Sequence, residues 1–309
     1  MDNLTHSLVG ALLGQAGLKR KTGLAMPALI IGANLPDVDA ACFFWLDGVE
    51  HLGFRRGITH GPPALVLLPL ILAGLLYGFD RWQAKRGKRP EGRLPVSLKW
   101  LFLLSFLGCL THPALDWLNV YGIRLLEPLS SQWFYGDTLF IIDVWLWALM
   151  GFAVWFSLRR EKRGGEWKRP ARIAMAAALG YIGVNGAISA KSTEPAPGVM
   201  TTISSPLPFL SFARDWISGS KNDWHYWHDS GANWVPLISQ DKRCAWPSES
   251  QLRSGGSQSE AFLFWSRAPF AERAPDGSVI LRDARYYDPR ARDRFSVALP
   301  DVKCEPLGE

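Results

Sequence analysis

An apolar run, PPALVLLPLILAGLLYGF at residues 62–79, decides the fold of this 309-residue chain. The run holds no charged residue, and about 20 such residues in a helix are enough to cross the hydrocarbon layer of a membrane. Runs of similar length and mostly apolar composition follow at 98–115, 138–158 and 171–190. These four segments predict a mainly α, polytopic membrane protein.

Two shorter apolar segments, at residues 7–18 and 24–35, precede the first long run. A helix of 12 residues spans only about 18 Å, which is less than the thickness of the hydrocarbon layer. We expect the two segments to form a helical hairpin that turns at residues 19–23. The helical domain, residues 1–190, would then contain about six membrane segments, the first two of them short.

Positive charges gather in the turn at 19–21 and in the loops at 80–99 and 159–172. Because cytoplasmic loops of membrane proteins are enriched in Lys and Arg, these three stretches are predicted to face the cytoplasm. The loops at 47–61 and 116–137 hold few positive charges and are predicted to face the periplasm or the exterior. The net charge of +6 therefore fits an inner-membrane protein that contacts lipids, and we expect no nucleic-acid partner.

The remainder of the chain has the composition of a soluble domain. Residues 191–199, KSTEPAPGV, are predicted to be a linker. Within residues 200–309, three strand-like runs at 261–265, 278–282 and 294–299 are separated by turn signals such as Pro-Asp-Gly. We therefore predict a small β-rich domain on the extracytoplasmic side.

The four cysteines divide between the two parts of the chain. Cys42 and Cys109 lie in apolar segments and are expected to be buried. Cys244 and Cys304 can form a disulfide if the C-terminal domain faces an oxidising compartment, and the sequence alone does not decide whether they do.

Ionisable side chains in a membrane domain are costly, so their positions indicate function. In the predicted topology they gather at the outer ends of the helices. The residues concerned are His6, Asp37, Asp39, His60, His112, Asp116, Asp137 and Asp143. Their gathering on one face of the membrane predicts a functional site there.

His112 and Asp116 are four residues apart, so a helix places both side chains on one face. Imidazole together with carboxylate favours zinc, with manganese or iron as alternatives, over calcium or magnesium. The predicted ligands of one or two ions are His6, Asp37, His60, His112 and Asp116, with Asp143 or Asp137 as a further ligand. A bound ion with an open coordination position would activate water for hydrolysis.

Several neighbouring side chains allow two interpretations. Asp37 and Asp39 can take part in catalysis, or Asp39 can instead orient a ligand histidine. Arg55 and Arg56 can hold a phosphate group of the substrate, with Arg56 steadying developing charge, or they can meet lipid headgroups. Asp143 can equally pair with one of these arginines.

The chain resembles the YdjM-like family of predicted membrane-bound metal-dependent hydrolases in four strings. They are THSLVG at 5–10, NLPDVD at 34–39, RRGITHG at 55–61 and HPALDWLNVYG at 112–122. The resemblance covers residues 1–150 well and the tail loosely. It implies a metal-dependent hydrolase embedded in the membrane.

A more distant similarity concerns the order of the ligands. The series His, Asp, His and then HxxxD is similar to the metal site of zinc-dependent phospholipase C and related single-strand nucleases, helical enzymes that cleave phosphodiesters with three zinc ions. The positions that match are His6, Asp37, His60, His112 and Asp116. Those enzymes also use a second pair of the HxxxE type, which this sequence lacks before residue 190, so one or two ions are expected here.

We therefore expect an integral membrane hydrolase, using zinc, that cleaves a phosphoester or similar bond at the outer membrane interface, where a lipid headgroup could reach it. The alternatives are a metal transporter or another non-enzymatic metal-binding membrane protein, and a scaffold in which these side chains only cap helices. Transporter sites usually lie near the bilayer midplane, whereas the predicted ligands lie at one face.

Overall fold

The structure is a computed structural model that describes residues 1–192, 202–221, 223–228 and 235–307. The chain divides into two compact units. The helical unit contains Met1–Asp39, Arg56–Ile188 and Pro208–Ser211, and the second unit contains Ala40–Arg55, Ser189–Leu207 and Phe212–Glu309. The short segments Ala40–Arg55 and Pro208–Ser211 thus belong to a different unit from the chain on either side of them.

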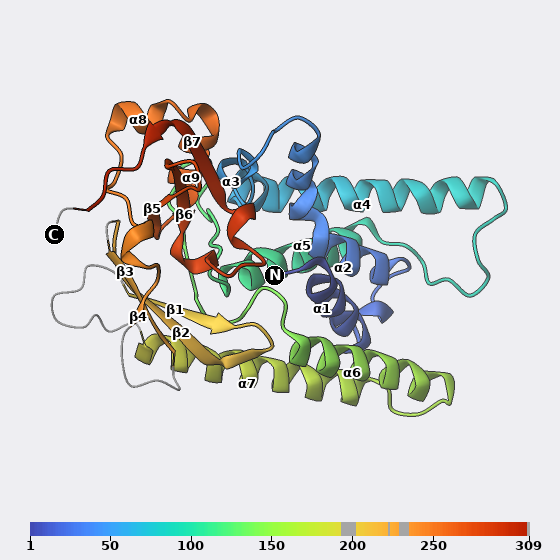
Figure 1. Cartoon of the computed structure of the whole chain (residues 1–309). Coiled ribbons are helices and arrows are strands. Elements are labelled where there is room, and N and C mark those ends of the chain that lie inside the picture. The colour runs from blue at the N-terminus through green and yellow to red at the C-terminus, as the bar shows by residue number, and fades with distance from the viewer. Residues whose placement is uncertain (193–201, 222, 229–234, 308–309) are drawn as a thin grey trace. The chain divides into compact units, whose positions relative to one another are not determined.

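The helical unit is built from six helices in the described residues, labelled in Figure 1. They are α1 (Asn3–Gln15), α2 (Ala25–Asn34), α4 (Pro62–Lys85), α5 (Leu98–Trp117), α6 (Val144–Lys162) and α7 (Lys168–Ser192). Short 3-10 helices join them at Leu18–Arg20 (η1), Leu35–Phe44 (η2) and Ile58–His60 (η3). The predicted order, a helical N-terminal part followed by a small β-sheet domain, is confirmed.

Four helical stretches in the described part of the chain are long and apolar enough to cross a membrane. They are Ala25–Phe44, Pro62–Lys85, Leu98–Trp117 and Lys168–Ala190. The expected count of six membrane segments is therefore not confirmed. The first of these stretches is longer than the predicted segment at 24–35, because η2 continues directly from α2.

Helix α6 also begins later than the apolar run at 138–158 predicts. The Asp143 carboxylate accepts the backbone N–H groups of Trp145 and Leu146 and thereby caps the helix at this residue. The six residues before the cap have no helical assignment; among them, Thr138 and Leu139 donate their N–H groups to the carbonyl of Leu118. An N-cap inside an apolar run thus shortens the helix that composition alone suggests.

Helices α1, α2 and α5 lie side by side because glycines allow their backbones to approach closely (Figure 1). A Cβ atom at Gly108 of α5 would lie 2.6 Å from the carbonyl oxygen of Leu29 on α2. A Cβ atom at Gly32 of α2 would lie 2.6 Å from the carbonyl oxygen of Ser105 on α5. Any larger residue at either position must push the two helices apart.

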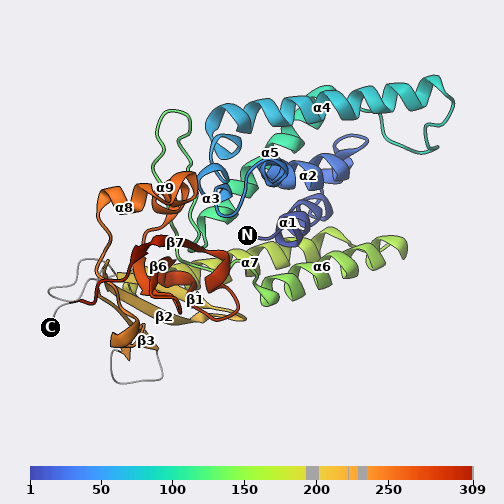
Figure 2. The same cartoon turned by 45° about the horizontal axis from the view of Figure 1, so that its top comes forward.

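A second layer of the helical unit is formed by α6 and α7, which run alongside each other (Figure 2). Leu146 and Met150 of α6 are buried together with Ala171 and Ala174 of α7. Small residues on α7 let the larger side chains of α6 fill the space between the helices.

The second unit contains two antiparallel sheets. The first has the order β1-β2-β3-β4, and the second has the order β5-β6-β7. Their strands are β1 (Thr202–Leu207), β2 (Leu210–Ser220), β3 (Asp223–His228), β4 (Val235–Pro236), β5 (Pro269–Arg273), β6 (Ser278–Asp283) and β7 (Ser296–Lys303). The predicted strands at 278–282 and 294–299 correspond to β6 and β7.

The strand predicted at 261–265 is wrong, since these residues end the helix α9 (Gly256–Trp265). Phe262 and Trp265 are fully buried, whereas Phe264 is exposed. Phe262 and Trp265 are three residues apart, a spacing that places both on one face of a helix. A short continuous apolar run in a sequence does not distinguish a strand from a buried helix. Helix α8 (Glu249–Arg253) precedes α9.

The cysteines agree with the sequence analysis and add to it. Cys42 and Cys109 are buried, as predicted, and neither takes part in a disulfide in the described part of the chain. Cys244 and Cys304 form a disulfide. Of the predicted linker at 191–199, the first two residues continue α7 and the remainder lies outside the described residues.

Candidate metal centre

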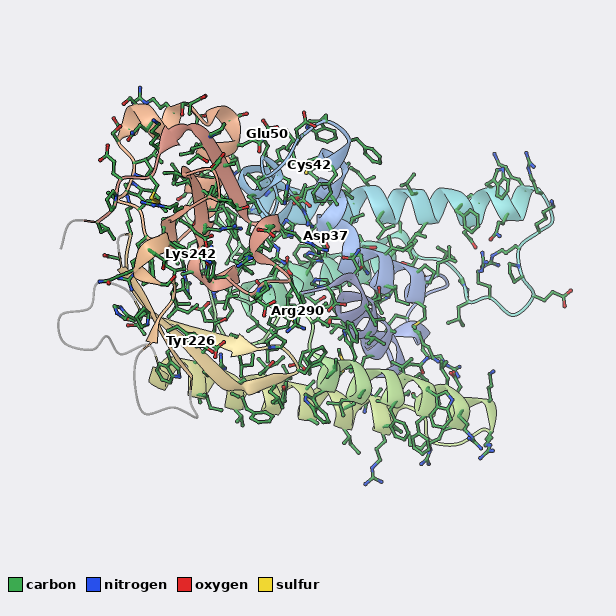
Figure 3. All side chains as sticks on the ribbon, viewed as in Figure 1. Asp37, Cys42, Glu50, Tyr226, Lys242 and Arg290 are labelled. Atoms are coloured by element: carbon green, nitrogen blue, oxygen red, sulfur yellow. A yellow bond between two sulfur atoms is a disulfide. The ribbon has the colours of Figure 1, made fainter. Side chains whose placement is uncertain are left out.

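The ends of several helices bring the predicted ligands together in the helical unit. The ligands come from the first turns of α1, from η2 just after α2, from η3 just before α4 and from the last turns of α5. They are His6, Asp37, His60, His112 and Asp116. Figure 3 labels Asp37, where the chain leaves α2.

Two overlapping groups of side chains could hold a metal ion. The first group is His6, Asp37 and His112, and the second is His60, His112 and Asp116. Within each group the ligand atoms all lie within 4.8 Å of one another. All five predicted core ligands are therefore in one cluster, as candidates for metal binding.

The Asp116 carboxylate lies at the centre of this cluster and is almost completely buried. Its Oδ1 atom lies 3.4 Å from Nε2 of His6 and also contacts the Met1 amine. Its Oδ2 atom lies 3.5 Å from Nε2 of His112 and 3.6 Å from Nε2 of His60. Three imidazoles therefore present a ring nitrogen to one carboxylate.

Hydrogen bonds to backbone and hydroxyl oxygens fix the orientation of two of these rings. Nδ1 of His112 lies 2.7 Å from the carbonyl oxygen of Ala33, so this nitrogen carries the proton and donates it. Nδ1 of His60 lies 2.9 Å from the Thr59 hydroxyl, which in turn lies 3.2 Å from Oδ2 of Asp39. In both rings Nε2 is left with a lone pair that faces Asp116.

The buried nitrogens in the cluster fit a metal ion. Within the described residues, both ring nitrogens of His6 and Nε2 of His60 and of His112 have no hydrogen-bond partner. Buried polar atoms in proteins nearly always have one, and a missing partner indicates an ion or a water. The rings of His6 and His112 stack with their centroids 3.8 Å apart, which is favourable for neutral imidazoles. Burial also lowers the pKa of His60 and so favours the neutral form that binds metals.

Comparison with known proteins shows to which family the chain belongs. The model of the YdjM inner membrane protein family matches residues 1–191. The chain belongs to this family. The uncharacterized protein YfhP of Bacillus subtilis (strain 168) is 26% identical over 167 residues, which are 51% of this chain. The match covers 47% of that relative, so the chain spans about half of the relative's length.

The family identifies the chain as a membrane protein, consistent with its apolar helices. No solved structure matches the chain. The more distant similarity to zinc-dependent phospholipase C is not shown by these comparisons.

Arg56 has partners inside the helical unit of this YdjM family member. Its Nε atom lies 3.0 Å from Oδ2 of Asp116, and its Nη1 atom donates to the Asn119 side chain at 3.0 Å. Its guanidinium carbon lies 4.5 Å from the centre of the Tyr121 ring. Arg56 is buried, so the geometry supports a role in positioning Asp116, whereas Arg55 lies over the ring of Phe43.

Asp39 and Asp143 lie outside both candidate groups. Oδ2 of Asp39 accepts the backbone N–H of Arg56 at 2.7 Å besides facing Thr59, which is the arrangement of a residue that orients a ligand. Asp143 accepts hydrogen bonds from Tyr181 and Ser211, in addition to capping α6. The structure therefore does not bring Asp143 to the cluster or pair it with an arginine in any described contact.

Sequence reasoning missed two supporting groups. Thr59 precedes His60 in the string RRGITHG. A hydroxyl next to a candidate ligand histidine is a sequence signal from which this supporting role could have been predicted. The carbonyl of Ala33 has no sequence signal, because its contact with His112 depends on how closely α2 approaches α5.

Proposed function

We propose that this YdjM family member is an integral membrane metal-dependent hydrolase that uses zinc, as one or two ions. Its proposed substrate is a phosphoester or similar bond, with membrane lipids as the leading class. The observation that carries the proposal is the set of buried ring nitrogens without hydrogen-bond partners that surround Asp116. Three imidazoles with carboxylates form a zinc donor set, and manganese or iron are the alternatives.

The site residues have different roles in the proposed reaction. When bound, an ion of this kind polarises a phosphoryl oxygen and lowers the pKa of a coordinated water. Arg56 holds the Asp116 carboxylate in place, and Thr59 keeps the proton on Nδ1 of His60. The Asp37 side chain is 12% exposed, against 1% or less for the other four candidate ligands. We assign Asp37 the role of taking a proton from the attacking water, since it is the group closest to solvent.

The location of the reaction is proposed from charge and redox chemistry. The cluster lies at the helix ends that lack the basic stretches 19–21, 80–99 and 159–172. Cytoplasmic ends are enriched in Lys and Arg, so the cluster is assigned to the periplasmic or exterior face. The Cys244–Cys304 disulfide supports the same side for the C-terminal domain, because disulfides persist in oxidising compartments.

A metal transporter is the second candidate, and one observation weighs against it. The candidate ligands come from the ends of helices, on residues that begin α1, follow α2, precede α4 and end α5. Transporter sites are usually formed near the middle of broken membrane helices, which allows access from both sides in turn. A hydrolase needs access from one side only.

Metal content tests the proposal directly. The protein is purified in detergent and its bound metals are measured by mass spectrometry, together with the variants His112→Ala and Asp116→Ala. We expect zinc in the parent protein and its loss in both variants. His51→Ala is the matched control, since His51 is in neither candidate group and its Nδ1 lies 3.0 Å from the carbonyl oxygen of Gly48. Unchanged metal content in both site variants would overturn the assignment.

Turnover is tested separately from binding. The metal-loaded protein is assayed with a chromogenic phosphodiester and with phospholipid vesicles, beside Asp37→Asn. We expect Asp37→Asn to lose at least a hundredfold in rate while it keeps the ion that the second group, His60, His112 and Asp116, would hold. A parent protein that binds zinc but cleaves neither substrate would favour a non-enzymatic role.

A further inference from the structure

The segment Ala40–Arg55 leaves the helical unit between two residues that lie next to the candidate metal centre. It starts after Asp39 and ends before Arg56. The backbone N–H of Arg56 donates to Oδ2 of Asp39 at 2.7 Å, which ties the two ends of the excursion together. Every residue of this segment therefore lies at most eight positions from Asp39 or Arg56 along the chain.

The segment is folded, because some of its side chains are buried. Cys42 and Leu52 are fully buried. Its short helix α3 (His51–Phe54) packs against α9, where a Cβ atom on Gly53 would lie 3.2 Å from Cβ of Ala261. Ser257 of α9 also donates a hydrogen bond to Glu50 (Figure 3 labels Cys42 and Glu50). These contacts fix the shape of the segment.

Aromatic side chains on the same segment are nevertheless exposed. Phe44 is 92% exposed, Trp45 60% and Phe43 54%, and Phe54 is 40% exposed. The Trp45 and Phe54 rings meet edge to face with their centroids 6.0 Å apart. We call these four residues the aromatic cluster. Clustered exposure of large apolar side chains on a folded segment marks a contact surface.

The observations favour a lipid bilayer as the partner of the aromatic cluster. Phe44 is the last residue of Ala25–Phe44, a stretch long and apolar enough to cross a membrane. Phe54 lies eight residues before Pro62, where the next such helix begins. Aromatic side chains with a neighbouring Arg are typical of the boundary between headgroups and acyl chains, and the Arg55 guanidinium lies 5.6 Å from the Phe43 ring centre.

The polar residues of the segment fit the same orientation. Asp47 is exposed and lies between Trp45 and the helix α3. Its backbone N–H donates to the Glu50 side chain at 3.1 Å, which folds the acidic part of the segment into a compact turn. Along the chain, apolar rings suited to lipid at 43–45 are thus followed by the acidic groups Asp47 and Glu50, which are suited to water.

We propose that the aromatic cluster inserts into the lipid layer at the membrane interface and holds the segment Ala40–Arg55 against the bilayer. The insertion does not depend on the proposed hydrolase activity. If that activity holds, the same contact explains why a membrane lipid is the expected substrate, because the ends of the segment are Asp39 and Arg56.

Spin labels placed at two neighbouring positions test the insertion. Cys42 and Cys109 are replaced by Ala, the disulfide is kept, and a nitroxide is attached to Phe44→Cys or, as the matched control, to Asp47→Cys. Each full-length protein is reconstituted into vesicles of phosphatidylethanolamine and phosphatidylglycerol. Collision rates with oxygen, which enters lipid, and with a water-soluble nickel chelate are measured by electron paramagnetic resonance.

We expect the label at position 44 to collide several times more often with oxygen, relative to nickel, than the label at position 47. Equal ratios at the two positions would overturn the proposal. Line broadening that disappears on dilution with unlabelled protein would assign the cluster to a contact with a second copy, which also overturns it. A label at Trp45→Cys repeats the test if Phe44→Cys does not fold, and an unchanged elution volume and helix content in detergent check folding in each case. Because no turnover is measured, an inactive protein leaves this result unaffected.

Discussion

The guanidinium of Arg56 and the carboxylate of Asp116 form a buried ion pair, with Nε 3.0 Å from Oδ2, in the middle of the candidate metal centre. The chain reaches this position through a left-handed backbone conformation at Arg56, whose φ is 55°. Three histidines already present ring nitrogens to the same carboxylate. The arginine therefore balances a charge that a metal ion would also balance.

This relationship predicts that Arg56→Met makes stability depend on the metal. Removing one partner of a buried ion pair costs about 3–5 kcal/mol, because the other charge is left uncompensated. We expect the Arg56→Met protein to melt well below the parent protein in chelator, and to regain much of the difference in excess zinc. The measurement is thermal unfolding in detergent under both conditions.

A control for this effect is Arg89→Met, which removes an ion pair with Asp80 at 3.1 Å outside the cluster. Partly exposed pairs contribute only about 0–1 kcal/mol. The melting temperature of the control should change little and should not respond to zinc. A zinc-independent loss of the same size in Arg56→Met would show that the arginine does not compensate for the metal.

The contacts among Asp39, Thr59 and His60 give a second prediction. Groups that orient a metal-binding histidine typically contribute about 10–100-fold to metal affinity. We expect Thr59→Val, which keeps the shape of the side chain but removes the hydroxyl, to weaken zinc binding by about tenfold or more. Competition with a fluorescent zinc chelator measures the affinity.

Thr111→Val is the matched control for this substitution. Its hydroxyl donates to the carbonyl of Gly108 within the same helix and does not contact a histidine in any described interaction. Zinc affinity should stay within about twofold of the parent value. Equal affinities for Thr59→Val and the control would remove Thr59 from the site.

The sequence predicts the helical part of the fold because its signals are long. Runs such as 62–79 are long and apolar enough to predict a membrane helix, and the structure has helices at all six predicted places. The run 261–265 is too short for this, and it forms a helix where a strand was predicted. The long apolar runs therefore predict the correct type of element, whereas the five-residue run does not.

The candidate ligands could be predicted for a different reason. His112 and Asp116 are linked by helical spacing, and the other ligands stand at helix ends that topology places together. The surroundings of these ligands depend on tertiary approach, which no local pattern encodes. The carbonyl of Ala33 is a ligand-orienting group only because α2 lies against α5. The partners of Arg56 and of Asp143 also depend on tertiary approach, so the sequence does not predict them.

Close approach of α2 and α5 leads to a third prediction, for Gly108→Ala. The added Cβ atom would lie 2.6 Å from the carbonyl oxygen of Leu29 and 3.0 Å from the backbone nitrogen of Ala33. Forcing extra atoms into a packed core costs about 1–3 kcal/mol and shifts the backbone. We expect lower stability together with weaker zinc binding, since the shift moves the carbonyl that holds His112.

Gly151→Ala on α6 provides the comparison for that change. Apart from the adjacent residues and the backbone of α6 itself, no described atom lies within 4 Å of a Cβ atom at Gly151, so the substitution should be neutral or should stabilise the helix by up to about 1 kcal/mol. Zinc content and melting temperature are measured for both variants. If Gly108→Ala behaves like the control, helix approach is not what positions His112.

The disulfide between Cys244 and Cys304 gives the last prediction, for the C-terminal domain. It joins residues 60 positions apart and connects the segment before α8 to the end of β7. Closing a loop of this length stabilises a domain by about 2–4 kcal/mol, mainly by restricting the unfolded chain. We expect the double variant Cys244→Ser and Cys304→Ser to lose protection of backbone amides in β5, β6 and β7, as measured by hydrogen exchange on the full-length protein.

Amides of α2 and α5 serve as the internal reference, because the disulfide lies outside the helical unit. Unchanged exchange in β5–β7 would mean that the sheet holds this domain together without the disulfide.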